Sequence, residues 1–246
     1  MEFDAIDFEQ PSLIDKAYQE IRKNILVGKM PPGYKLVVND LAEEWNISAT
    51  PIKQALNRLV SEELVEVLPR RGMRVKTYDA RELTETFETR TIDEMHCCRL
   101  AIERIDGHPE VEEELIAVLE KSRVALQDEF NYMSQYHFDE QFHMLLVSLS
   151  GNRKMMRDFD RLHANIMTFG IYASKHSPLW RQPATYEEHS RILEGLRNRS
   201  VKEMQEAMRF HLENTANDLL KFFHPKSGRF LGRKSSGGKA FPEDAQ

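Results

Sequence analysis

The sequence predicts a mainly α-helical protein with an N-terminal winged helix-turn-helix and a C-terminal all-α antiparallel bundle. Two observations predict this fold class. Residues 39–59 hold two short amphipathic helical patterns separated by a tight turn, followed by a β-rich pair of segments with a basic tip. From about residue 80 to residue 223 apolar residues recur at helical spacing, with short breaks and no useful strand-like alternation. A chain of 246 residues is long enough for two such domains.

The spacing within residues 39–59 predicts the helix-turn-helix itself. The first helix places apolar residues on one face: Leu41, Ala42 and Trp45. Residues 46–48 form the turn, Ser48 is expected to cap the second helix, and Pro51 is tolerated in its first turn. The outward row is short, polar and partly cationic, which suits the DNA major groove, and it comprises Ser48, Ala49, Thr50, Lys53, Gln54, Asn57 and Arg58.

The surroundings of these helices distinguish a winged helix from an ordinary helical hairpin. Upstream, residues 13–26 outline another amphipathic helix that ends at Gly28. Downstream, two β-rich runs at 64–68 and 73–76 flank a basic turn, predicted to be a DNA-contacting wing with Arg70, Arg71 and Gly72. Helix, helix-turn-helix and basic wing in this order are typical of a DNA-binding domain. We assign it to residues 11–78.

The net charge of −6 conceals an uneven distribution. Residues 11–78 carry 11 Lys and Arg against 8 Asp and Glu, a net charge of +3. Residues 79–246 carry 23 against 28, a net charge of −5, and the first ten residues add four acids. Because phosphate contacts depend on local charge, the acidic total does not exclude DNA binding.

Composition favours a soluble cytoplasmic protein. The two cysteines, Cys97 and Cys98, are adjacent and cannot form a disulfide framework, and small core residues are the simpler interpretation. No apolar run of about 18 residues exists, so no membrane contact is expected. The acidic N-terminus lacks the pattern of a secretion signal. The basic segment 224–246 has little to bury and is expected to be disordered, with weak nucleic-acid contact as an alternative.

Four potential metal ligands lie on the apolar faces of predicted helices in residues 79–223, the expected effector domain. Asp139 and His143 are four residues apart and therefore project from one face of a helix. His189 and His211 lie on apolar stripes of two later helices. One carboxylate and three imidazoles suit Zn²⁺, Ni²⁺, Mn²⁺ or Fe²⁺. From spacing alone, hydrogen-bonded core histidines and a simple carboxylate–imidazole pair remain open as alternatives.

The first domain resembles the DNA-binding domain of GntR-type bacterial transcription regulators. The matching stretches are "GKMPPGYKL", "NDLAEEWNISATPIKQALNRL", "ELVEV" and "PRRGMRV". The family usually has Arg where this chain has Ala49 and Lys53, and Gly where it has Glu63. Because Arg offers a bidentate fork that Ala and Lys lack, the resemblance implies the family fold but leaves its usual operator preference open.

The second domain resembles the FCD effector domain of the FadR branch of these regulators, over residues 80–223. The segments "FDEQFHMLLVSLSGN", "EEHSRILEGL" and "AMRFHL" match in order, so the resemblance implies a divalent metal ion held by Asp139, His143, His189 and His211. It also places Arg90 where the family has an Arg on the first bundle helix. Arg90 would then bind the carboxylate of an effector, while a salt bridge to Glu94 four residues on is the competing interpretation.

The resemblance implies a homodimer that binds a short palindromic double-stranded operator and responds to a small organic acid. We expect no enzymatic activity, because no general base accompanies the Asp/His set. Three alternatives remain at this stage: a metal-dependent hydrolase fused to a DNA-binding domain, a purely structural metal ion, and a bundle that only dimerises.

Overall fold

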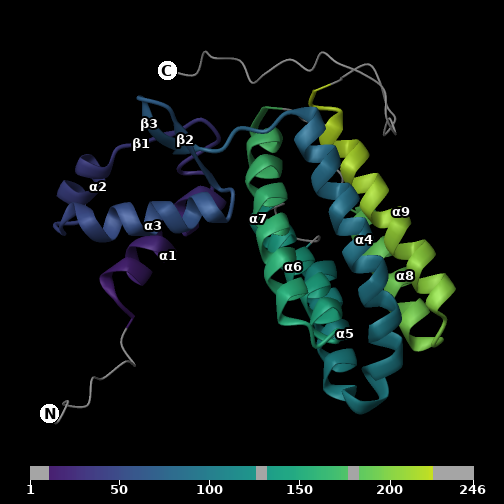
Figure 1. Cartoon of the computed structure of the whole chain (residues 1–246). Helices are drawn as coiled ribbons and strands as arrows, with labels where there is room; N and C mark the ends of the chain where they lie inside the picture. The colour runs from purple at the N-terminus through teal and green to yellow at the C-terminus, as the bar shows by residue number, and fades with distance from the viewer. Residues whose placement is uncertain (1–10, 126–131, 177–182, 224–246) are drawn as a thin grey trace, which may run out of the picture. The chain divides into compact units, whose positions relative to one another are not determined.

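The computed structural model describes residues 11–125, 132–176 and 183–223. The chain divides into two compact units, Met1–Thr77 and Tyr78–Gln246, which are described separately. The predicted helix break at residues 177–178 and the predicted disorder of 224–246 fall outside the described residues. The mainly α-helical fold class is confirmed (Figure 1).

Over residues 11–77, the first unit is a winged helix built from three helices and a small antiparallel sheet of strand order β1-β3-β2. Its elements are α1 (Leu13–Leu26), β1 (Lys35–Leu36), α2 (Val38–Glu44), α3 (Ala49–Ser61), β2 (Val65–Leu68) and β3 (Gly72–Val75). The wing therefore lies where the sequence predicted it. The two-residue strand β1 was not predicted, and it pairs with the central strand through Lys35 opposite Arg74.

Helix α1 begins with a capping box, in which Ser12 and Asp15 satisfy each other's backbone N–H groups. It ends before Gly28, whose φ of 70° continues the chain in the left-handed region, as predicted. On α1, Leu13 is 54% exposed, whereas Tyr18 is buried together with Ala17, Ile21 and Ile25.

The expected side-chain cap at Ser48 is wrong. Ser48 is the N-cap residue of α3 and has extended backbone, but its hydroxyl makes no capping hydrogen bond. The third helical position, a usual donor to such a cap, is Pro51, which has no N–H group. The preceding turn places Asn46 at φ 50°, a conformation that Asn tolerates better than most residues.

The second unit is an all-α bundle whose helices run side by side (Figure 1). Its elements are α4 (Ala80–Arg104), η1 (Ile105–Gly107), α5 (Pro109–Ala125), α6 (Tyr132–Ser148), α7 (Arg153–His176), α8 (Pro183–Arg197) and α9 (Val201–Leu220). Helix α9 packs against both α4 and α8, while α6 packs against α4, α5 and α7. This arrangement encloses the inward faces of α4, α6, α8 and α9.

The chain passes from one unit to the other through two consecutive anchored residues. The backbone N–H of Thr77 donates to Oε1 of Glu66 in the first unit, over 3.2 Å. Tyr78 is buried in the bundle, where its hydroxyl donates to Oδ1 of Asn165 over 2.5 Å. Asp79 then caps α4, with its carboxylate 2.8 Å from the backbone nitrogen of Glu82.

The main bundle core is apolar and surrounds the predicted ligand positions. Its buried residues include Cys98, Ala101, Leu115, Phe142, Leu146, Ile192, Leu196, Met204, Met208 and Leu212. Cys97 and Cys98 are both buried free thiols, in agreement with the core interpretation. Over the described part of the chain, no helix has the length and apolarity needed to cross a membrane.

Candidate metal centre

The structure brings Asp139, His143, His189 and His211 together. One potential ligand atom from each lies within 4.8 Å of the others. The imidazole Nε2 atom of His143 lies 3.2 Å from that of His189 and 3.1 Å from that of His211, and the latter two are 3.4 Å apart. Oδ1 of Asp139 lies 3.3–3.8 Å from the three nitrogens. Helices α6, α8 and α9 supply these four groups.

A close approach of helices α8 and α9 contributes to this convergence. Gly195 on α8 faces the backbone of Met204 on α9, and a Cβ atom at Gly195 would lie 2.5 Å from the Met204 nitrogen. A larger residue would therefore separate the two helices that carry His189 and His211.

The hydrogen-bond partners of two histidines fix which nitrogen faces the centre. Nδ1 of His143 lies 2.5 Å from Oε2 of Glu94, and Nδ1 of His211 lies 2.9 Å from Oε2 of Glu188. Because a carboxylate accepts, both Nδ1 atoms carry hydrogen. In the neutral rings that metal coordination requires, both Nε2 atoms are then bare lone pairs. Two lone pairs only 3.1 Å apart repel each other unless a cation lies between them.

The separations and donor types fit a divalent ion. Bonds of about 2.0–2.1 Å to imidazole nitrogen place two neighbouring nitrogen ligands roughly 2.9–3.4 Å apart. The observed 3.1–3.4 Å lies in that range. Histidine ligands that donate their other N–H to a carboxylate are typical of metal sites.

Charge gives a second reason for the fit. The buried carboxylates Glu94 and Glu188 contact the histidines, and Asp139 faces them. With the buried guanidinium of Arg90, these groups carry a net charge of −2 when the imidazoles are neutral. A divalent cation offsets that charge, which is costly to bury uncompensated.

The electrostatic environment favours the charged forms of Asp139 and Glu94 and the neutral forms of His189 and His211. Burial would raise the pKa of Asp139, but His143, His163 and His189 outweigh it and hold the pKa well below its usual range. Burial would also raise the pKa of Glu94, but Arg90 and His143 outweigh burial and lower that pKa to about 2. Burial and then the charge of His211 lower the pKa of His189 to about 3. These are the protonation states that metal coordination requires.

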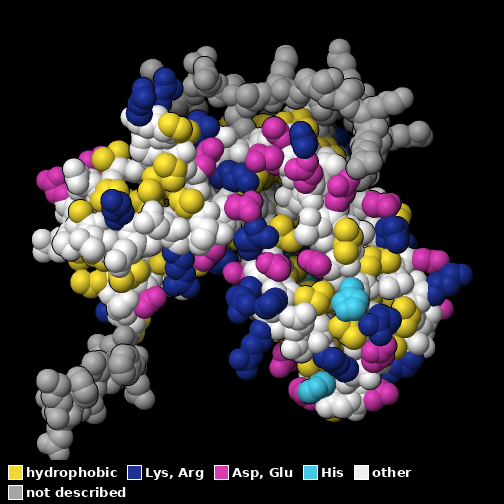
Figure 2. Space-filling model, in the orientation of Figure 1, with side chains coloured by type: hydrophobic (Ala, Val, Ile, Leu, Met, Phe, Trp, Pro, Cys, Tyr) yellow, Lys and Arg dark blue, Asp and Glu magenta, His cyan; other side chains and the backbone are white. Residues whose placement is uncertain are grey.

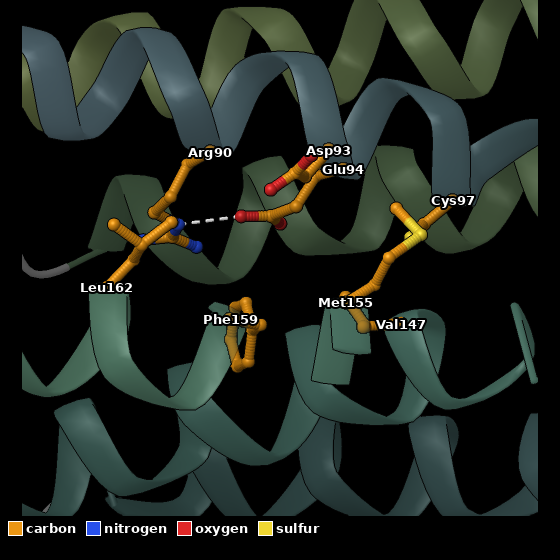
Figure 3. A pocket seen from close by; sticks show the side chains of 8 residues that line it. All are labelled: Arg90, Asp93, Glu94, Cys97, Val147, Met155, Phe159 and Leu162. Atoms are coloured by element: carbon orange, nitrogen blue, oxygen red, sulfur yellow. Dashed lines mark hydrogen bonds and ion pairs between the residues drawn. The ribbon is translucent and has the colours of Figure 1, made fainter. Parts of the chain in front are cut away.

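Arg90 is buried and paired, as the salt-bridge interpretation expected. Its Nε donates to Oε1 of Glu94 over 2.6 Å, so Glu94 connects Arg90 to His143. Its Nη2 atom is buried without a hydrogen-bond partner among the described residues. Arg90 also lines a small cavity, partly open to solvent, to which α4, α6 and α7 contribute residues (Figure 3). The remaining lining residues are Asp93, Glu94, Cys97, Val147, Met155, Phe159 and Leu162.

Three residues around the centre were not predicted from the sequence: His163, Glu188 and Asn214. His163 lies 3.0 Å from Oδ2 of Asp139, and Asn214 donates to Oε1 of Glu188 over 2.7 Å. His163 follows Phe159 by four residues on an apolar helix face, a pattern that reads as core. Glu188 precedes His189 directly, and adjacent residues on a helix project in different directions.

The predicted DNA-contacting residues are all exposed on the winged helix. Those of α3 and its N-cap are Ser48, Ala49, Thr50, Lys53, Gln54, Asn57 and Arg58, and those of the wing are Arg70, Arg71 and Gly72. Figure 2 shows basic side chains at the tip of the β2–β3 hairpin. On the visible face of the bundle, acidic and basic groups are interspersed instead (Figure 2).

Arg58 differs from the rest of this row because it is already engaged. Its guanidinium lies 3.7 Å from the ring centroid of Tyr18 on α1. It also lies 3.3 Å from Asp15 and 3.6 Å from Glu62. The contacts with Tyr18 and Asp15 join α3 to α1. Because Arg58 already interacts with an aromatic ring and two carboxylates, its charge is partly compensated within the protein.

A winged helix followed by a helical bundle with a buried Asp/His centre defines a class of two-domain DNA-binding proteins, and comparison with known proteins agrees. Residues 13–75 match the model for bacterial regulatory proteins of the gntR family, and residues 85–214 match the FCD domain. The chain belongs to the GntR family and carries an FCD domain. It is a DNA-binding transcription regulator.

Individual relatives are consistent with this assignment. The chain is 24% identical over 220 residues to the HTH-type transcriptional regulator BphR of Paraburkholderia xenovorans, covering 86% of each. It is 25% identical over 210 residues to the HTH-type transcriptional repressor GlaR of Escherichia coli, covering 79% of this chain and 90% of GlaR. The solved structure of E. coli McbR/YncC shares the fold, with a TM-score of 0.73, 22% identity, and coverage of 86% and 99%. The relatives of the present chain are transcription regulators, as expected for a protein that is not an enzyme.

Proposed function

We propose that this regulator binds a divalent metal ion through Asp139, His143, His189 and His211 and uses it to sense a small organic acid. The supporting observation is the meeting of three imidazole Nε2 atoms, two of them fixed as lone pairs by Glu94 and Glu188. Zn²⁺, Ni²⁺, Mn²⁺ and Fe²⁺ accept this donor set. When bound, the ion supplies positive charge and open coordination positions for a carboxylate.

Arg90 is the proposed effector contact within the protein. Its Nη2 donor is buried without a partner among the described residues, and leaving such a donor unsatisfied is costly. An effector carboxylate or hydroxyl that reaches the cavity lined by Arg90 would satisfy it. Because Glu94 already neutralises much of the charge of Arg90, the ion rather than Arg90 would supply most of the attraction for the acid.

The DNA-binding surface is proposed to comprise the exposed row of α3 and the tip of the wing. Thr50, Gln54 and Asn57 are suited to base edges, and Lys53, Arg70 and Arg71 to phosphate. A homodimer would present two such surfaces to a short palindromic operator, as helix-turn-helix proteins commonly do. The acid would change the affinity of this dimer for DNA by a coupling free energy of about 1–3 kcal/mol. Membership of the FadR branch and action in the cytoplasm belong to the same proposal.

Elemental analysis of the purified protein, with His143→Ala and His137→Ala variants, tests the metal proposal. Both histidines lie on α6, but His137 is exposed, whereas His143 is fully buried in the centre. We expect about one divalent ion per chain in the wild type and in H137A, and loss of the ion in H143A. Equal metal content in all three proteins would contradict the proposed ligand set.

Operator affinity measured by fluorescence anisotropy tests the sensing role. A panel of small carboxylic acids is added to metal-loaded protein and to protein treated with a chelator. We expect at least one acid to shift the dissociation constant in the metal-loaded protein alone. A purely structural ion would instead stabilise the bundle against heat while every acid left DNA affinity unchanged, and that result would refute chelation by the effector.

A further inference from the structure

A fourth histidine, His163 on α7, contacts the candidate metal centre, although the four proposed ligands come from α6, α8 and α9. Its Nε2 atom lies 3.0 Å from Oδ2 of Asp139, whereas the ion-facing atom of Asp139 is Oδ1. The side chain of His163 is 1% exposed, and its ring stacks on Phe159 with centroids 5.4 Å apart. The contact therefore joins a buried imidazole to a carboxylate that is 17% exposed.

The direction of this hydrogen bond follows from the charge of Asp139. The carboxylate accepts, so Nε2 of His163 carries the hydrogen. The other ring nitrogen, Nδ1, is buried without a partner among the described residues, so no protein group competes for a different tautomer. The two oxygens of Asp139 thus have separate roles: Oδ2 accepts from His163, and Oδ1 faces the three imidazoles.

This division limits how Asp139 can bind an ion. A carboxylate with both oxygens free can coordinate in a bidentate way and occupy two positions. Holding Oδ2 in a hydrogen bond leaves one oxygen for the ion and fixes the plane of the carboxylate. An additional coordination position then remains available to an incoming ligand.

We infer that His163 is a positioning residue that holds Asp139 in one-oxygen coordination and thereby keeps the effector position of the ion open. The inference rests on the proposed function, because it concerns the same ion. It assigns a specific role to a residue of α7, a helix that contributes none of the four proposed ligands. The ligand expected at the open coordination position is a carboxylate from outside the protein, because the hydrogen bond from His163 prevents Asp139 from filling that position.

Three variants separate this role from simple packing. His163→Gln keeps an N–H donor at a reach similar to that of Nε2, whereas His163→Leu removes it and His163→Asn shortens it. Thr168→Val is the matched control, since Thr168 is also buried on α7 but bonds only to its own helix, at the carbonyl of Ala164. Each protein is loaded with Co²⁺, and its visible absorption is recorded before and after adding acetate. Zn²⁺ affinity is measured in parallel by competition with a coloured chelator.

We expect H163L and H163N to lose about 10–100-fold in Zn²⁺ affinity, the usual effect of removing a partner that orients a ligand. Their Co²⁺ spectra should show weaker bands, as higher coordination produces, and should respond less to acetate. H163Q and T168V should resemble the wild type in both measurements. If H163L fails to fold, the comparison of H163N with H163Q still tests the positioning role of His163.

Identical spectra and affinities for H163N, H163Q and the wild type would overturn the positioning role while leaving the metal site intact. Failure of the wild type itself to bind Co²⁺ or Zn²⁺ would overturn the proposed function and this inference together. The two failures are therefore distinguishable.

Discussion

The Nδ1 atom of His143 lies 2.5 Å from Oε2 of Glu94, while the other oxygen of the same carboxylate lies 2.6 Å from Nε of Arg90. Glu94 therefore couples a cationic side chain of its own helix, α4, to a histidine on α6. All three side chains are at most 2% exposed. Breaking such a pair by removing one charge is expected to cost more than the pair itself contributes.

Glu94→Gln should destabilise the bundle strongly. The change leaves Arg90 as a buried charge without its partner, for which the expected cost is about 3–5 kcal/mol. Glu103→Gln is a matched control, because Glu103 forms the same i, i+4 pair with Arg99 on α4 but is 49% exposed. Its expected cost is within about 1 kcal/mol. Urea unfolding of both variants measures the difference, and similar losses would refute the buried coupling.

The metal-free protein should lose stability as the pH falls below about 6.5. The pKa of His189 is about 3 in the folded protein, below its usual value of 6.5. Between pH 3 and pH 6.5, His189 is therefore protonated in the unfolded chain but neutral in the folded protein. Stability is fully present above the upper value and is lost by up to about 1.4 kcal/mol per pH unit on the way down. Burial also lowers the pKa of His211, so His211 adds to the loss of stability as the pH falls.

Denaturant unfolding in chelator at several pH values measures this slope. His189→Asn removes the titrating group and should flatten the curve. A slope unchanged by that substitution would assign the pH dependence to other groups.

Glu63→Gly should stabilise the winged helix. Glu63 follows α3 with φ 61°, a left-handed conformation that costs a residue with a Cβ roughly 1–2 kcal/mol. The substitution also removes an exposed ion pair with Lys76, worth about 0–1 kcal/mol. We therefore expect a small net gain in thermal midpoint. Glu63→Ala loses the ion pair and keeps the strain, so it should not share the gain.

Lys53 and Arg58 should behave differently although both face outward from α3. Lys53→Ala should weaken operator binding and reduce the slope of log affinity against log salt by about 1, because Lys53 is proposed to contact phosphate. Arg58→Ala should lower unfolding stability, because it loses the contacts to Tyr18 and Asp15 that join α3 to α1. Anisotropy titrations at three salt concentrations, together with urea unfolding, separate the two effects. A larger salt effect in R58A than in K53A would reverse their roles.

The sequence predicts the helices and the wing because their signals are local. Ser12, Gly28 and Asp79 mark helix ends by their own chemistry. Strand β1 has only two residues, too few for any alternation, and it exists because β3 offers it a pairing edge. The missing cap at Ser48 is also local, and the proline three residues on could have indicated it.

The candidate site was predictable only in part. The i, i+4 spacing placed Asp139 and His143 together, but spacing could not bring His189 and His211 to them; the family resemblance suggested that. His163 could not be recognised, since its role depends on how α7 packs on α6. Glu188 and Asn214 depend likewise on the packing of α8 on α9.

The peptide bond between Thr77 and Tyr78 is the boundary between the two units, and residues on both sides of it are held by hydrogen bonds. The connection between the two units is therefore short, because each of its residues is held by a hydrogen bond within its own unit. Inserting a few glycines at this bond would lengthen the connection while leaving both units folded. Such a variant tests whether the response of DNA binding to a ligand depends on the length of the connection.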